Sequence, residues 1–575
     1  FLYFARTLPG QTLGVVAALL FSGLLSGLGI AALFPVLQIV IEGGTADPAG
    51  AGGFAGRVVD GPDALRIPAE LEPLLAVTMA IFLTKAIVLL VAKRQVGYAV
   101  TEVATGLRLR LLRALLRTRW SYYTRLPIGQ ATNALTSEAD RAGLTYNLVA
   151  QVVQYAIMVA IGLGLAFAVS WRATLMVGTA SIFLTVLLRF LVRMAGRAGR
   201  RQTRLLRSLA AGLTDVLGAA KLLRATAREA LVGDLLEHDT RRLNKALRKQ
   251  VLAREALGVS HEPLAMAVIL LGIWGAVRVV NMPAAEITIL GFLFIRSLGD
   301  ISRVQRKYQS MTVNESALWS ILELIDGAEA QEEPAGGTRV PTLERGLSLR
   351  GVTVEYDGQN VLDGVDVEVP AGSITAMIGP SGSGKTTIAD LFVGIASPQG
   401  GSVEVDGVAL PELDLKAWRR GIGYVAQELL LLNDTVRTNV TLGDANISDE
   451  AVERALRAAD AWEVVSRLPG GLDAPVGERG ALLSGGQRQR IQIARALVLE
   501  PRLLVMDEAT ASLDSETEAS VLATISQLRG RTTVVAISHQ PALVDVADRV
   551  YRIEEGHAQL TKGGAAELPS VEGVA

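Results

Sequence analysis

The chain has 575 residues, half of them hydrophobic, and its mean hydropathy is +0.36. This length exceeds that of one domain, and this hydropathy is high for a water-soluble enzyme. The net charge of −1 argues against a nucleic-acid partner, and the absence of cysteine excludes disulfides and cysteine metal sites.

Six apolar stretches in the first part of the chain are long enough to cross a bilayer core of ~30 Å, which takes about 20 residues of helix. They cover residues 13–41, 74–92, 144–169, 173–192, 257–280 and 284–301. Polar helical patterns extend several of them, to about residue 117, from 193 to 254, and to residue 325. We therefore predict an all-α transmembrane domain of six helices over residues 1–325, followed by a linker over residues 326–345.

The distribution of arginine and lysine predicts how these spans are oriented. The loop after the first span carries only Arg57 and Arg66 against six acidic residues, whereas the segments after the second and fourth spans are rich in arginine. Positive loops stay in the cytoplasm, so we expect both termini and all residues after the sixth span to be cytoplasmic.

The stretch from residue 379 to 387 reads G-P-S-G-S-G-K-T-T and fits the phosphate-binding P-loop pattern. A strand over residues 374–378 and a helix over 386–393 are predicted around it, which would direct a helix N-terminus at a phosphate. Lys385 can reach the β- and γ-phosphates, and the Thr386 hydroxyl can bind Mg²⁺. The predicted phosphate-binding residues are Gly379, Pro380, Ser381, Gly382, Ser383, Gly384, Lys385, Thr386 and Thr387.

A second buried strand, predicted over residues 503–508, ends in two carboxylates. Asp507 stands at its end and suits a magnesium ion beside a P-loop, and Glu508 comes next. We predict that Glu508 orients or deprotonates the water that attacks the nucleotide.

A second phosphate-binding helix N-terminus is predicted at Ser484, Gly485, Gly486 and Gln487, before an amphipathic helix over residues 491–499. Two such N-termini in one domain favour a nucleotide held between two copies of the chain.

Leu483–Gln487 resembles the signature of ABC transporter ATPases, and the other family motifs occur in order around it. The resemblance implies an α/β P-loop ATPase with a helical subdomain over residues 346–562, followed by a disordered tail over 563–575. It implies further site residues with distinct tasks. These are Tyr356 stacking on adenine, Gln427 contacting Mg²⁺ and the membrane domain, Asp514 in the D-loop, and His539 at the γ-phosphate.

The whole chain resembles an exporter-type ABC half-transporter, with six spans fused to one ATPase. That resemblance implies ATP and Mg²⁺ as cofactors, alternating access, and a homodimer, with a heterodimer also possible. It implies a multi-pass protein of the bacterial inner membrane with its ATPase domain in the cytoplasm. It also implies short coupling helices near residues 119–126 and 213–220.

Lys85 and Arg296 are the candidate substrate-binding residues, because at about 1.5 Å per residue both lie roughly 17 Å deep in their spans. They form either a basic belt for an anionic substrate, or cations that pair with carboxylates or extend to the membrane surface. Residues 27–35 resemble the first span of bacterial flippases for lipid-linked oligosaccharides. We therefore expect export or flipping of an anionic lipid. The alternatives are a peptide or multidrug exporter, and an ATP-gated channel or regulator on the same scaffold.

Overall fold

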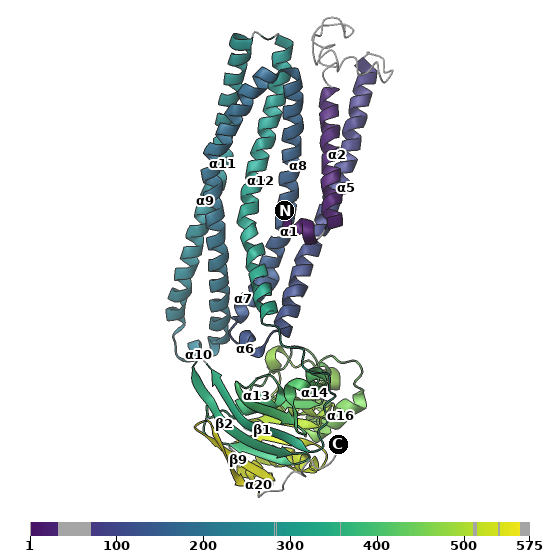
Figure 1. Ribbon diagram of the computed structural model, residues 1–575, viewed down its shortest axis with the longest axis vertical. Coiled ribbons are helices and arrows are strands. Elements are labelled where there is room, and N and C mark those ends of the chain that lie inside the picture. The colour runs from purple at the N-terminus through teal and green to yellow at the C-terminus, as the bar shows by residue number, and fades with distance from the viewer. Residues whose placement is uncertain are drawn as a thin grey trace, which may run out of the picture. The chain divides into compact units, whose positions relative to one another are not determined.

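A computed structural model describes residues 2–7, 9–32, 71–280, 282, 284–356, 358–509, 515–538 and 541–563. The chain divides into two compact units. One comprises Phe1–Thr118 and Tyr122–Glu332, and the other comprises Arg119–Ser121 and Glu333–Ala575. The first unit is helical, and the second combines strands with shorter helices (Figure 1).

Six long helices, of 23 to 48 residues, form most of the described part of the first unit. They are α2 (Pro9–Ala31), α5 (Leu71–Arg117), α8 (Ala139–Val169), α9 (Trp171–Gly218), α11 (Glu229–Gly275) and α12 (Ala284–Ala330). Helix α2 packs along α5, α8 along α12, and α9 along α11 (Figure 1).

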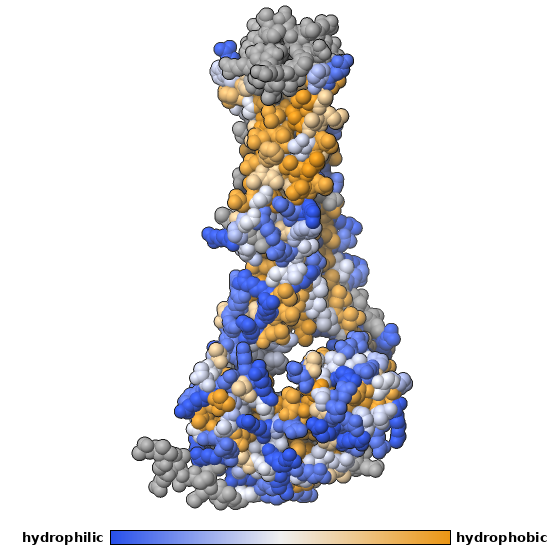
Figure 2. Space-filling view, turned by 90° about the vertical axis from the view of Figure 1, so that its right-hand side faces the viewer, coloured by the Kyte–Doolittle hydropathy of each residue, from blue (hydrophilic) through white to orange (hydrophobic). Residues whose placement is uncertain are grey.

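The apolar parts of these helices suit a membrane. Within the described residues, four segments are long and apolar enough to span one. They are Pro9–Ile30, Glu72–Arg117, Ile128–Val169 and Glu237–Arg278. Figure 2 shows a continuous apolar band on the visible face of this unit, with polar side chains increasing along the helices beyond it. The helices therefore continue past the apolar band as polar extensions, as the sequence predicts.

Small residues bring α2 close to its neighbours. A Cβ added at Gly23 would lie 2.7 Å from the Ile157 side chain, and one at Gly27 would lie 2.8 Å from Ile161. Both isoleucines belong to α8, so larger residues on this face of α2 would force the two helices apart.

Two helix boundaries differ from the prediction. The polar stretch predicted as one helix over 193–254 is broken between Gly218 and Glu229, where the short α10 (Ala220–Ala225) intervenes. Ala227 in this segment has a φ of +50°, which an α-helix does not allow. The segment contains neither a proline nor a pair of glycines, so the sequence does not predict the break. The second predicted coupling segment, 213–220, therefore falls mostly in the last turns of α9.

The second difference is that α12 continues to Ala330, five residues into the predicted linker. Gly327 lies inside this helix, and a Cβ there would be 2.7 Å from the Tyr122 hydroxyl. A larger residue would therefore displace the Tyr122 side chain. Shorter helical segments complete the described part of this unit. They are α1 (Leu2–Thr7), α7 (Ile128–Asn133) and the π-helical turns Ala134–Glu138 and Ala276–Val280. The short α6 (Trp120–Tyr123) is divided between the two units.

Two sheets organise the described part of the second unit. The first has the strand order β2-β1-β4-β5, and the second has the order β10-β9-β3-β8-β7-β6. The strands are β1 (Gly346–Tyr356), β2 (Gln359–Pro370), β3 (Ile374–Ile378), β4 (Gly400–Val405), β5 (Val408–Ala409), β6 (Ile422–Val425), β7 (Leu503–Asp507), β8 (Thr533–Ile537), β9 (Arg549–Glu554) and β10 (His557–Lys562). Strands β7 and β8 are wholly buried, as expected for parallel strands covered on both faces.

The helices of this unit follow the strands or form the segment between β6 and β7. They are α13 (Lys385–Val393), α14 (Leu415–Arg420), α15 (Val436–Thr441), α16 (Asp449–Ala458), α17 (Trp462–Arg467), α18 (Gly485–Leu497), α19 (Ser515–Gln527) and α20 (Pro541–Val546). Strand β3 lies between β8 and β9 and runs parallel to both, so the P-loop leaves the interior of the sheet at its carboxyl edge. Ligands of open parallel sheets bind at that edge.

Candidate functional site

The P-loop connects β3 to α13 through a turn that only glycine can build. Gly379 has a φ of +150°, and a Cβ there would lie 2.0 Å from the Ile553 carbonyl oxygen. Gly384 has a φ of +99° and directly precedes α13, and its Cβ would lie 2.7 Å from the Leu362 side chain. Both positions therefore need glycine for backbone reasons, and the turn leaves the first N–H groups of α13 facing outward for an anion.

The Lys385 amine is held by the loop itself. It donates hydrogen bonds to the carbonyl oxygens of Gly379, at 2.9 Å, and of Pro380, at 2.7 Å. Burial lowers the pKa of Lys385, and the carboxylates of Glu508 and Asp507 oppose that shift. The ammonium thus lies inside the loop, where a phosphate would replace neutral carbonyls as its acceptor.

Asp507 meets the P-loop helix at its first turn. The Thr386 hydroxyl donates to the Asp507 carboxylate at 3.0 Å, and burial raises the pKa of Asp507. Among the described residues, no group of three or more histidine or acidic side chains could hold a metal alone. A metal bound here would therefore take further ligands from outside this pair, such as phosphates and water.

Glu508 and Gln427 lie together at the same edge of the sheet. Their strands, β7 and β6, are parallel neighbours, and the Gln427 amide donates to the Glu508 carboxylate at 2.7 Å. Glu508 has a φ of +49°, a left-handed conformation that is costly for a residue with a side chain. The chain turns abruptly at Glu508, and the amide holds its carboxylate at the carboxyl end of β7.

Tyr356 ends β1 with a partly exposed ring, and its hydroxyl lies near the Thr387 side chain. Partial burial raises the pKa of Tyr356. An aromatic ring therefore stands beside the P-loop helix, where it can stack on a nucleotide base.

Asp390 was not predicted as a site residue. It lies one turn after Thr386 on α13. Burial, reinforced by the charge of Asp507, raises its pKa to about 6. The only signal in the sequence is its position as the one charged residue among apolar side chains in residues 388–393.

The signature residues form the start of a helix rather than a turn before one. Helix α18 begins at Gly485, six residues earlier than predicted, with Ser484 as its N-cap. The Ser484 hydroxyl accepts from the Gln487 N–H at 3.3 Å, and the Gln487 side chain accepts from the Ser484 N–H at 3.0 Å. Ser-x-x-Gln is a capping box, which the sequence pattern could have revealed.

Within the described part of the chain, no hydrogen bond joins the signature residues 484–487 to the P-loop. A Cβ at Gly485 would meet nothing within 4 Å, so this chain does not itself require glycine there. Two predicted site residues, Asp514 and His539, lie outside the described residues, as do residues 33–41 of the first span and 564–575 of the tail.

Lys85 and Arg296 converge on one hydroxyl group. The Lys85 amine donates to the Ser26 hydroxyl oxygen at 3.0 Å, and the Arg296 guanidinium donates to the same oxygen at 2.8 Å. The three residues belong to α5, α12 and α2. In the described structure neither cation forms an ion pair, and the acid nearest along α12, Asp300, is bonded to Arg303 at 2.8 Å. The arrangement thus differs from the predicted alternative in which each cation pairs with a structural carboxylate.

Comparisons with known proteins agree with these observations. Residues 15–297 match the family model for the ABC transporter transmembrane region, and residues 362–511 match that for the ABC transporter. The ATP-dependent lipid A-core flippase of Burkholderia pseudomallei is 32% identical over 521 residues, which cover 85% of this chain and 86% of that protein. The flippase of the same name from Paraburkholderia xenovorans is 31% identical over 492 residues, covering 83% and 81%. A solved structure of a bacterial Atm1-family ABC exporter with ATP bound shares the fold, with a TM-score of 0.79, 21% identity and 96% of each chain covered.

Proposed function

This chain belongs to the ABC transporter family, as an exporter-type half-transporter that couples ATP hydrolysis to transport, and on that premise we propose that it flips an anionic lipid across the membrane. The observation that carries the proposal is the pair of cations on Ser26, placed among apolar helices with no carboxylate within ion-pair distance of either in the described structure. The names of the flippase relatives support the same substrate class.

A lipid phosphate fits this pair of cations for electrostatic reasons. Two positive charges that share a neutral hydroxyl repel each other, and in a medium of low polarity that repulsion is weakly screened. An anionic group between them would accept charge-assisted hydrogen bonds from both and remove the repulsion. We therefore assign Lys85 and Arg296 to the substrate headgroup.

The working unit that we propose is a homodimer. Each chain carries one P-loop and one signature. A complete nucleotide site would combine the P-loop of one copy with the signature of a second copy. The open space at Gly485 supports this assembly, because a second copy could bring its nucleotide close to the N-terminus of α18. Both half-sites would then be equivalent.

We propose that the nucleotide binds with Mg²⁺. The Thr386 hydroxyl and the Asp507 carboxylate, 3.0 Å apart, are the hard oxygen ligands that magnesium prefers, and the Gln427 amide oxygen is a candidate third ligand. When bound, the ion supplies positive charge against the phosphates during transfer of the γ-phosphoryl group.

The remaining residues divide the work of hydrolysis. Lys385 and the first N–H groups of α13 hold the phosphates, and Tyr356 stacks on the base. Glu508, oriented by Gln427, aligns and deprotonates the attacking water. We propose that His539 and Asp514 complete the site, as the family motifs imply. We further propose the inner membrane of a bacterium as its location, with the ATPase in the cytoplasm, since arginine-rich segments remain on that side.

Charge reversal at the cation pair tests the substrate assignment. In Lys85→Glu and in Arg296→Glu, we expect anionic lipid to lose its effect, so that the ratio of lipid-stimulated to basal ATPase activity falls to about one. Arg94→Glu is the matched control on α5, because Arg94 contacts Tyr98 on the same helix and not Ser26. Stimulation that survives both reversals would contradict the assignment.

The substrate itself is identified by what accompanies the protein. Lipids and peptides that co-purify with it are to be determined by mass spectrometry and then added back to the lipid-free protein. We expect anionic lipids to be enriched and to stimulate ATPase activity. Enrichment of peptides alone, with no response to lipid, would favour a peptide exporter.

A further inference from the structure

Helix α14 contacts the carboxyl end of α13, the helix that follows the P-loop. The Trp418 indole N–H donates to the Phe392 carbonyl oxygen at 2.9 Å. The Arg419 guanidinium donates to the carbonyl oxygens of Val393, at 3.4 Å, and of Gly394, at 2.5 Å. The last carbonyls of a helix have no partner within it and carry its negative partial charge, so a cation suits them. Helix α14 therefore holds one end of a helix whose other end begins at the P-loop.

The same guanidinium also holds the segment that follows the membrane helices. Glu333 comes three residues after the end of α12, and the main segment of the second unit begins with it. The Arg419 guanidinium donates to both oxygens of the Glu333 carboxylate, at 2.8 and 2.5 Å. Only 30% of the Arg419 side chain and 32% of the Glu333 side chain are exposed. A paired and partly buried contact of this kind fixes the two groups more firmly than an exposed ion pair does.

The linker after Glu333 is bonded to the residues that lead into α14. The Gly337 N–H donates to the Leu413 carbonyl oxygen at 2.9 Å, and a Cβ at Gly337 would lie 1.8 Å from the Glu412 carbonyl oxygen. The Asp414 N–H donates to the Arg339 carbonyl oxygen at 2.8 Å, and Asp414 is the N-cap of α14. Helix α14 is thus bonded to the linker at both of its ends.

We infer that α14 transmits movement of the P-loop helix to α12 through the linker, with Arg419 and Glu333 as positioning residues. The N-terminus of α13 is drawn toward nucleotide phosphates when they bind. With nine residues and a length of about 13 Å, α13 shifts as one rigid element. Its carboxyl end then displaces Arg419, and Arg419 displaces Glu333. This route is separate from Gln427, and it does not depend on which substrate is carried.

The sharing of one guanidinium between two partners distinguishes transmission from simple fastening. A cap for α13 needs only the carbonyls of that helix. An anchor for the linker needs only a cation on the surface, and the adjacent Arg420 is exposed, with no side-chain hydrogen bond or ion pair in the described structure. Arg419 instead joins the end of the P-loop helix directly to the residue that follows α12.

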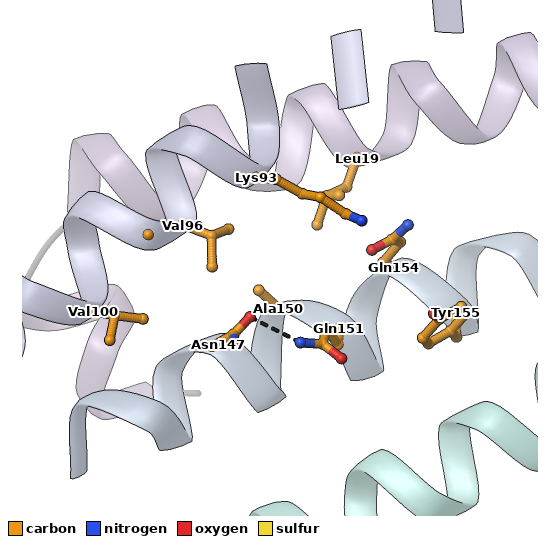
Figure 3. Close-up of a pocket in the computed structure, with 10 residues that line it drawn as sticks. Leu19, Lys93, Val96, Val100, Asn147, Ala150, Gln151, Gln154 and Tyr155 are labelled. Carbon is orange, nitrogen blue, oxygen red and sulfur yellow. Dashed lines mark hydrogen bonds between the residues drawn. The ribbon is translucent and has the colours of Figure 1, made fainter. Parts of the chain in front are cut away.

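A cavity in the first unit provides a way to observe movement of α12. Figure 3 shows this cavity, of about 420 Å³, between α5 and α8, with the Gln154 side chain of α8 facing it. Helix α8 packs along α12, so displacement of α12 should change the surroundings of Gln154. The chain has no cysteine, and Gln154→Cys therefore accepts one environment-sensitive fluorophore at a single position.

The test compares variants of the full-length, labelled Gln154→Cys protein in nanodiscs as a non-hydrolysable ATP analogue is added. Filter binding of the radiolabelled analogue gives its Kd alongside. We expect Glu333→Gln to leave this Kd unchanged and to reduce the fluorescence change at saturation to about a fifth or less of that in the parent protein. Arg419→Gln should lose the same change and also raise the Kd roughly fivefold, because α13 loses its cap.

Two matched controls remove a neighbouring charge outside this contact. Glu332→Gln removes a carboxylate that lies 3.8 Å from Arg117, and Arg420→Gln removes the exposed arginine of α14. Both should match the parent protein in Kd and in fluorescence.

The measurement contains no transported substrate, so its result is independent of whether the protein flips lipid. An undiminished fluorescence change in Glu333→Gln would overturn transmission through α14, as would an equal loss in Glu332→Gln. A parent protein in which bound nucleotide alters neither the fluorescence nor the maleimide reactivity of the cysteine at position 154 would overturn it as well.

Discussion

Glu508→Gln is expected to lower the rate of ATP hydrolysis by roughly 10²- to 10⁴-fold, which is the usual contribution of a positioned general base. The glutamine keeps the shape of the side chain and its contact with Gln427, which lies 2.7 Å away in the wild type. It cannot accept the proton of the attacking water. ATP should therefore still bind, and the two ATPase domains should remain closed on it. Single-turnover hydrolysis and retention of labelled ATP by the purified protein measure the two effects.

Glu555→Gln is the matched control for that variant. Glu555 also follows a strand of the same sheet, and its φ of +49° equals that of Glu508. Any penalty that comes only from replacing a glutamate in a left-handed conformation should appear in both variants. Loss of hydrolysis in Glu508→Gln alone assigns the effect to chemistry, whereas near-normal turnover in it would remove Glu508 from the mechanism.

Lys385→Ala should reduce ATP affinity and hydrolysis together, with a loss in kcat/KM of roughly 10²- to 10³-fold. The ammonium lies within hydrogen-bond distance of two P-loop carbonyls, at 2.9 and 2.7 Å, where a γ-phosphate would accept its hydrogen bonds. A charged hydrogen bond in a partly buried site contributes several kcal/mol to binding of the phosphates in the transition state.

Lys416→Ala serves as the control, because Lys416 is an exposed lysine on α14 in the same unit. Equilibrium binding of a fluorescent ATP analogue separates affinity from turnover, and the unfolding temperature reports the fold. Unaltered ATP affinity in the folded Lys385→Ala protein would contradict the assigned contact.

Local sequence signals predicted the P-loop well and the signature helix less well. The strand before the P-loop begins and ends where predicted, and the helix after it starts one residue earlier, because glycines on either side punctuate both elements. Helix α18 was placed six residues too late, since paired glycines and polar side chains favour a turn by propensity alone. Its capping box, which involves Ser484 and Gln487, overrides that preference.

Tertiary contacts account for what could not be predicted. Depth along the spans indicated that Lys85 and Arg296 lie at a similar level in the membrane. Their common partner Ser26 lies on a third helix and follows from packing alone. The contact between Gln427 and Glu508 likewise depends on two strands, β6 and β7, lying side by side in the sheet. The break at residues 219–228 is instead a local feature of the backbone. These residues contain no proline, so the sequence does not indicate the break.

ATP-driven movement of an anionic lipid between leaflets tests the account most directly. The purified protein is to be reconstituted in liposomes with fluorescent phosphatidylinositol, and a membrane-impermeant quencher then measures how much label remains in the outer leaflet. We predict that ATP added outside moves the label out of the outer leaflet when the ATPase domain also lies outside. Neither Glu508→Gln nor Lys85→Glu should show this movement. A wild-type protein that hydrolyses ATP in these liposomes, yet moves no more lipid than Glu508→Gln, would contradict the proposed function.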